Sequence, residues 1–170
     1  MERIAVGLNI TGYVRLIECD ALKYPTYESV DMAIKYGEAV ISPWIKNIIP
    51  TVGKIAIARR LRNAASQSNE GMITYGAVGT GTTPAAATDT TLETELFRKI
   101  LAQRTNDNNE CTFRMYMTTS EGNGTLTEYG LFGEAASASA DSGTLFERVI
   151  ISKTKTSSKT LTIETKITVG

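Results

Sequence analysis

Residues 111–132 read CTFRMYMTTSEGNGTLTEYGLF, and this stretch decides the predicted fold. Over 111–117, Cys, Phe and Met at the odd positions alternate with Thr, Arg and Tyr at the even positions, which is the period of a strand with one face on a core. Asn123 and Gly124 form the dipeptide that favours a type I′ turn with positive φ at both residues. We therefore expect a β-hairpin whose second strand runs from Leu126 to Phe132, with Asn123 and Gly124 as its turn.

The same alternation recurs on both sides of this stretch. It predicts strands over 72–78, 145–151 and 161–169, and either a hairpin or a bulged strand over 3–19. Several short strands separated by turns are typical of a sandwich. The predicted fold is mainly β: an antiparallel β-sandwich with one or two short helices and an extended N-terminal arm.

Two segments have helical spacing. From Thr51, a candidate N-cap, apolar residues recur every three or four positions and predict one amphipathic helix. These residues are Val52, Ile55, Ala58, Leu61 and Ala65. The spacing places Leu61 against the sheet. Leu92, Leu96 and Ile100 stand at four-residue steps, which predicts a second, short helix over 89–97.

The first 45 residues are interpreted as an arm rather than as part of the core domain at 46–170. Three of the four prolines lie between positions 25 and 50, and each disfavours helix at the residue before it. The arm holds four aromatic residues that we consider candidate interface anchors, and ordinary packing on the domain is the alternative. They are Tyr24, Tyr27, Tyr36 and Trp44.

Composition narrows the classes of function. The 170 residues include no histidine, so catalytic triads, Cys-His pairs and His-ligated metals are excluded. Eighteen basic residues balance eighteen acidic ones, which disfavours a nucleic-acid-binding protein and favours self-association. We expect no enzyme activity, no cofactor and no metal. A glycosidase that uses paired carboxylates near Glu121, Glu128 and Glu134 is the distant enzymatic alternative.

No apolar run approaches the twenty residues of a transmembrane helix, and Met1-Glu2-Arg3 does not open a signal peptide. We therefore expect a soluble protein that is made inside the cell and does not span a membrane. Cys19 and Cys111 are the two thiols. Two buried apolar side chains are the main interpretation, and a single disulfide is the alternative.

The glycine-rich stretch 76–83 invites comparison with a phosphate-binding loop. Pro84 follows where a dinucleotide fingerprint needs glycine, and no Lys-Ser/Thr pair is present for a Walker loop. Gly79 and Gly81 are therefore interpreted as turn residues with positive φ. Glu128 lies among apolar neighbours, which makes it a candidate buried carboxylate bonded to backbone amides.

Six segments, taken in order, carry a resemblance to a known group of proteins. They are NIIPTVGKIAIARRL at 47–61, ITYGAVGTGTT at 73–83, DTTLETELFRK at 89–99, NGTLTEYGLF at 123–132, GTLFER at 143–148 and KTSSKTLT at 155–162. In this order they resemble a family of virion proteins of tailed bacteriophages, described as tail or tail-fibre-associated structural proteins. The resemblance covers about 46–170.

The resemblance implies a β-sandwich subunit of a symmetric virion assembly, made in the cytoplasm of the bacterial host, with no catalytic residues to carry over. The expected partners are copies of the same chain and other tail, neck or fibre proteins, without nucleic acid or membrane. Two alternatives stay open: a carbohydrate- or receptor-binding module of a tail fibre, and a head decoration protein.

Overall fold

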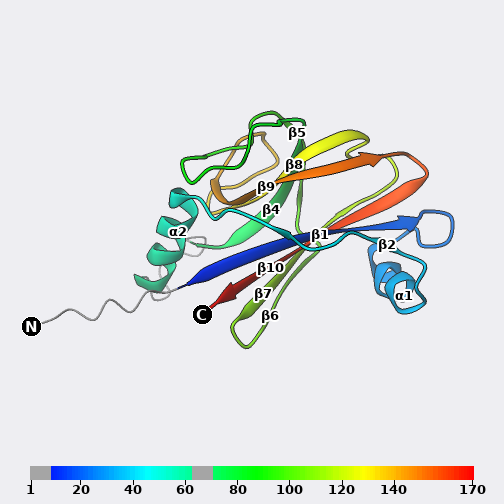
Figure 1. The fold of residues 1–170 in the computed structure, drawn as a ribbon, viewed down its shortest axis with the longest axis horizontal. Helices are drawn as coiled ribbons and strands as arrows, with labels where there is room; N and C mark the ends of the chain where they lie inside the picture. Colours follow the sequence, from blue (N-terminus) through cyan, green and yellow to red (C-terminus); the bar gives the residue numbers. More distant parts are fainter. Residues whose placement is uncertain (1–8, 63–70) are drawn as a thin grey trace, which may run out of the picture.

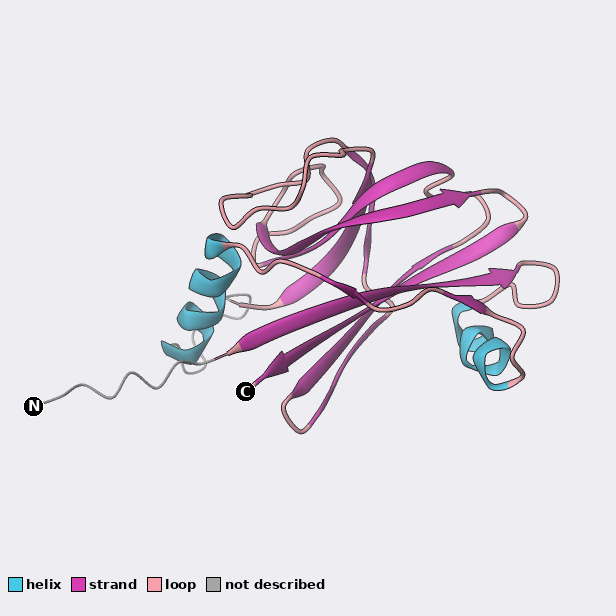
Figure 2. Ribbon diagram, in the orientation of Figure 1, coloured by secondary structure: helices cyan, strands magenta, loops and turns pink. Residues whose placement is uncertain are grey.

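A computed structural model describes residues 9–62 and 71–170. Thirteen elements follow one another along the chain (Figures 1 and 2). They are β1 (Ile10–Asp20), the 3₁₀ helix η1 (Tyr27–Ser29), α1 (Val30–Lys35), β2 (Val40–Ile41), β3 (Ile45–Lys46), α2 (Thr51–Arg62), β4 (Ile73–Gly79), β5 (Glu95–Ile100), β6 (Gln103–Asp107), β7 (Glu110–Met117), β8 (Gly124–Gly133), β9 (Thr144–Lys155) and β10 (Lys159–Val169). Within these residues no helix is long and apolar enough to cross a membrane.

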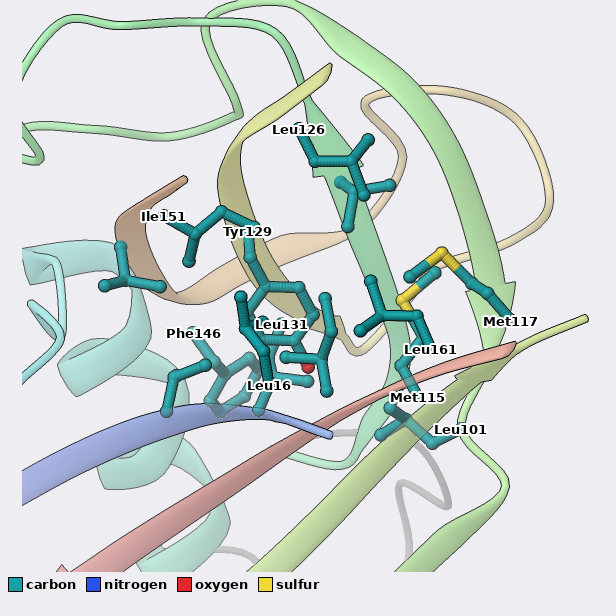
Figure 3. Packing of buried hydrophobic residues seen from close by; sticks show 14 of the residues in the cluster. Leu16, Leu101, Met115, Met117, Leu126, Tyr129, Leu131, Phe146, Ile151 and Leu161 are labelled. Atoms are coloured by element: carbon teal, nitrogen blue, oxygen red, sulfur yellow. The ribbon is translucent and has the colours of Figure 1, made fainter. Parts of the chain in front are cut away.

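The strands form two antiparallel sheets, so the predicted fold class is correct. The first sheet has the order β2-β1-β10-β7-β6, with β3 also paired to β1, and the second has the order β5-β4-β8-β9. Inward-facing side chains of both sheets make the main core, in which Met115, Tyr129 and Leu161 are fully buried (Figure 3). The alternation predicted for 111–117 and 161–169 is present, because each strand has one face on this core.

The predicted hairpin between 111–117 and 126–132 is wrong. β7 pairs with β10 and β6 in the first sheet, whereas β8 pairs with β4 and β9 in the second. Residues 118–123 therefore cross from one sheet to the other. Of the expected turn residues, Gly124 has φ +128° and Asn123 does not have positive φ, while Gly122 does, at +59°. The connection is thus not a type I′ turn.

The boundary expected at residue 45 is also wrong for the described part of the arm. β1 is one continuous strand over Ile10–Asp20, and it pairs with β10 along its whole length. Val14 and Leu16 on this strand are buried in the main core. The outer face of β1 packs against η1 and α1 through Ile17, Tyr24 and Val30, which belong to a second buried cluster. Residues 10–45 are thus part of the sandwich, and the part of the predicted arm at residues 1–8 lies outside the described residues.

The helix over 51–62 is present, but the face predicted for it is not the one that packs. Ile55 and Leu61 are exposed, whereas Gly53 and Ala56 are buried beside β9. The absence of a side chain at Gly53 allows the helix to approach the backbone of Phe146, because a Cβ there would lie 2.7 Å from the Phe146 carbonyl oxygen. Ala65 lies outside the described residues. The two buried residues of this face are thus small, and Val52 and Ile57 beside them pack partly against the hydrophobic clusters.

This packing gives a testable contrast. Gly53→Ala should lower the free energy of unfolding by about 1–3 kcal/mol, because the added methyl meets backbone atoms of β9 that cannot rotate away. The same exchange in a free helix is stabilising by about 1 kcal/mol. Leu61 is 76% exposed, so Leu61→Ala should change the free energy of unfolding by less than about 0.5 kcal/mol. Urea denaturation of both variants measures this, and a stabilised Gly53→Ala protein would contradict the packing.

The second predicted helix, over 89–97, is replaced by a loop and a strand. Residues 80–94 form a long loop, and β5 begins at Glu95. Leu92 is buried in a third cluster with Phe132 and Leu145, whereas Leu96 is 49% exposed. The four-residue spacing that suggested a helix therefore connects one residue of a loop to residues of an edge strand.

Candidate functional site

The outer face of the first sheet carries a row of charged side chains on three adjacent strands. Because alternate residues of a strand face opposite sides, residues that flank the core positions of β1, β10 and β7 point outward together. Glu164 on β10 lies opposite Arg15 on β1 and Arg114 on β7. Its carboxylate accepts hydrogen bonds from Arg15 Nε at 2.8 Å and Arg114 Nε at 2.6 Å.

This row is continued by α1, which packs over one end of the same face. Asp31 accepts a hydrogen bond from Arg114 Nη1 at 2.8 Å. Burial alone would lower the pKa of Arg114, but its hydrogen bonds with Asp31 and Glu164 raise that pKa above the ordinary value. The guanidinium therefore stays charged, and the row holds the 21–46 segment on the sheet.

Beside the charged row lies an open groove of about 400 Å³, which we call the Trp44 groove. It is lined by Tyr13, Trp44, Glu110, Lys166 and Thr168. The Arg15 guanidinium carbon stands 4.6 Å from the centre of the Trp44 ring, and Lys166 Nζ stands 5.8 Å from it. Both cations rise from the sheet, so they hold the indole over the outer face by cation–π contact. The Tyr13 and Trp44 side chains remain 39% exposed.

The four aromatic residues predicted as interface anchors do not gather in one place. Tyr24 is buried and donates a hydrogen bond from its hydroxyl to Glu38 at 2.9 Å. Tyr27 donates to Gln103 at 2.7 Å and meets Tyr116 edge-on, with 5.8 Å between the ring centres. These two rings attach the helical segment to the sheet. Tyr36 and Trp44 stay exposed, and their role as anchors remains a prediction.

Exposed apolar side chains concentrate in residues 36–48, which we call the edge segment. It runs along β1 as β2 and β3 and then reaches the second sheet, where Ile48 exchanges two backbone hydrogen bonds of 3.0 Å with Arg148 (Figure 1). Five of the thirteen large hydrophobic side chains found exposed among the described residues lie here. They are Tyr36, Val40, Ile41, Trp44 and Ile48. Concentrations of exposed apolar side chains are common where proteins bind one another.

Glu128 on β8 is fully buried and lies at the centre of a second charged group. It accepts hydrogen bonds from the backbone N–H groups of Gly81, Glu93 and Thr94 at 2.8–3.0 Å. It also pairs with Arg148 on β9 at 2.9 Å, through both Nε and Nη2. The expectation of a buried carboxylate bonded to backbone amides thus describes this site as it is found.

Arg148 connects this carboxylate to the 80–94 loop. Its Nη1 donates to Asp89 at 2.8 Å and its Nη2 donates to the Thr83 carbonyl at 3.1 Å. Burial works against the charge, but the hydrogen bonds with Asp89 and Glu128 raise the pKa of Arg148. The charged groups at the centre of this network therefore hold the loop on the sheet.

Gly79 and Gly81 serve this network by leaving space, and the prediction of positive φ at both is wrong. A Cβ on either residue would lie 2.5 Å from Glu128 Oε1. At Gly79 it would also lie 2.3 Å from the Thr94 carbonyl oxygen. The two glycines are thus required by the close approach of a carboxylate and a strand, which the sequence pattern alone does not reveal.

A buried carboxyl group that the sequence analysis missed lies between the sheets. Glu147 on β9 is fully buried, and burial raises its pKa to about 8. Thr165 donates a hydrogen bond to it at 2.9 Å, and Asn47 Nδ2 donates a second. Among the described residues it forms no ion pair. The alternation of the strand could have indicated its burial, because Glu147 is in phase with Val149 and Ile151, which face the core.

The remaining candidates are simpler. Cys19 is buried on β1 and Cys111 is partly buried on β7, and both thiols are free. Burial raises the pKa of Cys19. Cys111 lines an apolar hollow of about 480 Å³ between α2 and the ends of β4, β7 and β10. Among the residues that the structure describes, no three Cys, Asp or Glu side chains gather as ligands for a metal ion.

Comparison with known proteins adds no relative, because no protein family, no curated protein and no solved structure matches this chain.

Proposed function

We propose that this chain is a non-enzymatic structural protein of a bacteriophage virion, which assembles with copies of itself and docks other tail, neck or fibre proteins. The observation that carries the proposal is the edge segment. Its exposed apolar side chains lie on short strands at the end of a sheet, where β2 is the last strand among the described residues and presents an edge to which a further strand can pair. Addition of a strand from a neighbour is a recurrent way to satisfy such an edge.

The placement in a virion rests on the six sequence segments that resemble phage structural proteins. Several of their residues meet in the buried network around Glu128: Gly79, Gly81, Asp89 and Arg148. Residues that hold a loop on a sheet are expected to recur in a family of structural proteins, because its members share one fold. This supports a structural role for the chain.

Self-assembly can be tested with two substitutions on exposed positions. Wild-type protein should elute as an oligomer in size-exclusion chromatography with light scattering, and Val40→Glu and Ile41→Glu should each shift it to the monomer, because each places a charge in an apolar contact. Leu22→Glu is the matched control, since Leu22 is 98% exposed and lies outside the edge segment. It should elute like the wild type.

A wild-type protein that stays monomeric at about 100 μM, a concentration that would populate even weak assemblies, would contradict self-assembly. The virion location has its own test. Antibodies raised against the chain should label particles of the phage that encodes it in electron microscopy, and unlabelled particles from which the chain is absent by mass spectrometry would contradict that part.

A further inference from the structure

We propose that the Trp44 groove binds a neutral saccharide. The groove shares Trp44 with the edge segment, but saccharide binding does not depend on self-assembly. It rests on three properties of the groove: two aromatic walls, compensated charges, and donors and acceptors side by side.

The walls are the exposed rings of Tyr13 and Trp44. Sugar rings present apolar C–H faces that pack on aromatic surfaces, while their hydroxyl groups remain at the rim. Aromatic rings with a polar handle suit such amphipathic ligands, because the ring buries area and the polar atom stays available. The groove volume of about 400 Å³ is within the range of sites for small ligands.

The charges of the groove cancel locally, which selects against an ionic ligand. Lys166 Nζ donates to Glu110, and Glu164 pairs with Arg15 and Arg114. A phosphate or a carboxylate would have to compete with Glu110 for Lys166, and a cationic ligand would have to compete with Lys166 for Glu110. A neutral ligand does not disturb these pairs.

The same groups provide hydrogen bonding in both directions. The Lys166 ammonium donates, the Glu110 carboxylate accepts, and the Thr168 hydroxyl can do either. A hydroxyl group is itself both donor and acceptor, so a ligand with several hydroxyls can satisfy all three residues at once. This combination of an aromatic wall with mixed polar groups is met by a saccharide.

The chain contains a single tryptophan, so intrinsic tryptophan fluorescence reports on this groove alone. We would titrate the full-length protein with four neutral trisaccharides: maltotriose, cellotriose, mannotriose and N,N′,N″-triacetylchitotriose. Trigalacturonate serves as the charged counterpart. At least one neutral sugar should give a saturable change with a Kd on the order of 1 mM, the range expected where only one face of a ligand is buried. Trigalacturonate should bind at least about tenfold more weakly.

Three substitutions locate the binding. Tyr13→Ala should weaken it about tenfold or more, and Tyr13→Phe should retain it, because the ring face and not the hydroxyl makes the wall. Tyr36→Ala is the matched control at another exposed tyrosine, and binding should be unchanged. Thermal denaturation verifies that each variant is folded.

The proposal is overturned if none of the neutral sugars gives a saturable change, if trigalacturonate binds more tightly than all of them, or if Tyr13→Ala binds as the wild type does. The Val40→Glu variant separates this inference from the assembly proposal. It should bind the sugar as the wild type does, whatever its oligomeric state, because Val40 does not line the groove.

Discussion

The free energy of unfolding should fall by about 3–4 kcal/mol as the pH rises from 5 to 8, and Glu147→Gln should remove this fall. Glu147 lies between the two sheets, where burial raises its pKa from 4.5 to about 8. Its polar partners, Asn47, Thr165 and Tyr129, are uncharged. Burial also raises the pKa of Tyr129, and the negative charge of an ionised Glu147 adds to that rise.

The direction of the change follows from proton binding. In the unfolded chain Glu147 loses its proton near pH 4.5, whereas in the folded protein it keeps it up to about pH 8. Between these values the folded state binds more protons, so stability decreases with pH by about 1.4 kcal/mol per unit. The stabilising contribution is complete below pH 4.5 and is lost above pH 8. Carboxylates with lowered pKa, such as Glu38 and Glu93, act below this window.

A protonated Glu147 also suits its surroundings. Asn47 Oδ1 and the Tyr129 hydroxyl are buried without a hydrogen-bond partner among the described residues. A neutral carboxyl group brings a donor into this cluster, and the amide of a glutamine does the same without titrating. Urea denaturation at pH 5, 6, 7 and 8 provides the measurement. Glu28→Gln, at an exposed carboxylate on η1, is the control and should follow the wild type.

Equal pH dependence in the wild type and Glu147→Gln would show that Glu147 is not the titrating group. If the variant is less stable than the wild type at pH 5 but more stable at pH 8, the two stability curves cross inside the window. That crossing is the expected signature, because the substitution loses the carboxyl contacts at acid pH and gains by lacking a buried charge at alkaline pH.

The strands whose positions were predicted well are those with one face on the core and one in solvent. Residues 111–117 and 161–169 show this alternation, and both segments lie on the first sheet with apolar residues inward. Which strands pair with one another could not be predicted from this alternation. The Asn123-Gly124 dipeptide suggested that 126–132 folds back on 111–117, but both strands find partners far away in sequence, and local pattern carries no information on those pairings.

The face of α2 and the site around Glu128 show a second limit. Periodicity counts large apolar residues, and it therefore chose Ile55 and Leu61, which are exposed. The buried positions of the packing face are Gly53 and Ala56, where small side chains let the helix approach β9 closely. For Glu128 the apolar neighbours correctly suggested burial, but its partner Arg148 is 20 residues away and its amide donors lie in the 80–94 loop.

Alternation with Val149 and Ile151 places Glu147 on the core side, but the β-bulge in β9 breaks this pattern at the other end of the strand. The pairing of β8 with β9 shifts between Leu131 and Phe132, so that Phe146 and Glu147 both belong to the interior while Leu145 packs in the third cluster on the other face. A regular alternation would place Leu145 and Glu147 on the same face. Bulges are set by the pairing of two strands, and single-sequence periodicity does not report them.

Arg148→Met should lower the free energy of unfolding by about 3–5 kcal/mol, because it leaves the fully buried carboxylate of Glu128 without its counter-charge. The three backbone N–H groups that bond to Glu128 remain, but they come from the 80–94 loop, which Arg148 itself holds through Asp89 and Thr83. The substitution therefore weakens the loop as well as the ion pair. Limited proteolysis should detect cleavage within 80–94 that the wild type resists.

A double-mutant cycle separates the lost pair from the lost packing. Adding Glu128→Gln to Arg148→Met removes the unpaired charge, so the double variant should recover part of the stability lost in the single variant, with a coupling energy of about 1–3 kcal/mol. Lys159→Met is the control, because its pair with Asp20 is exposed and should contribute less than about 1 kcal/mol. A cost below about 1 kcal/mol for Arg148→Met, or a double variant as unstable as the sum of the two single ones, would mean that the loop is held by its backbone contacts and Leu92 rather than by the charge network.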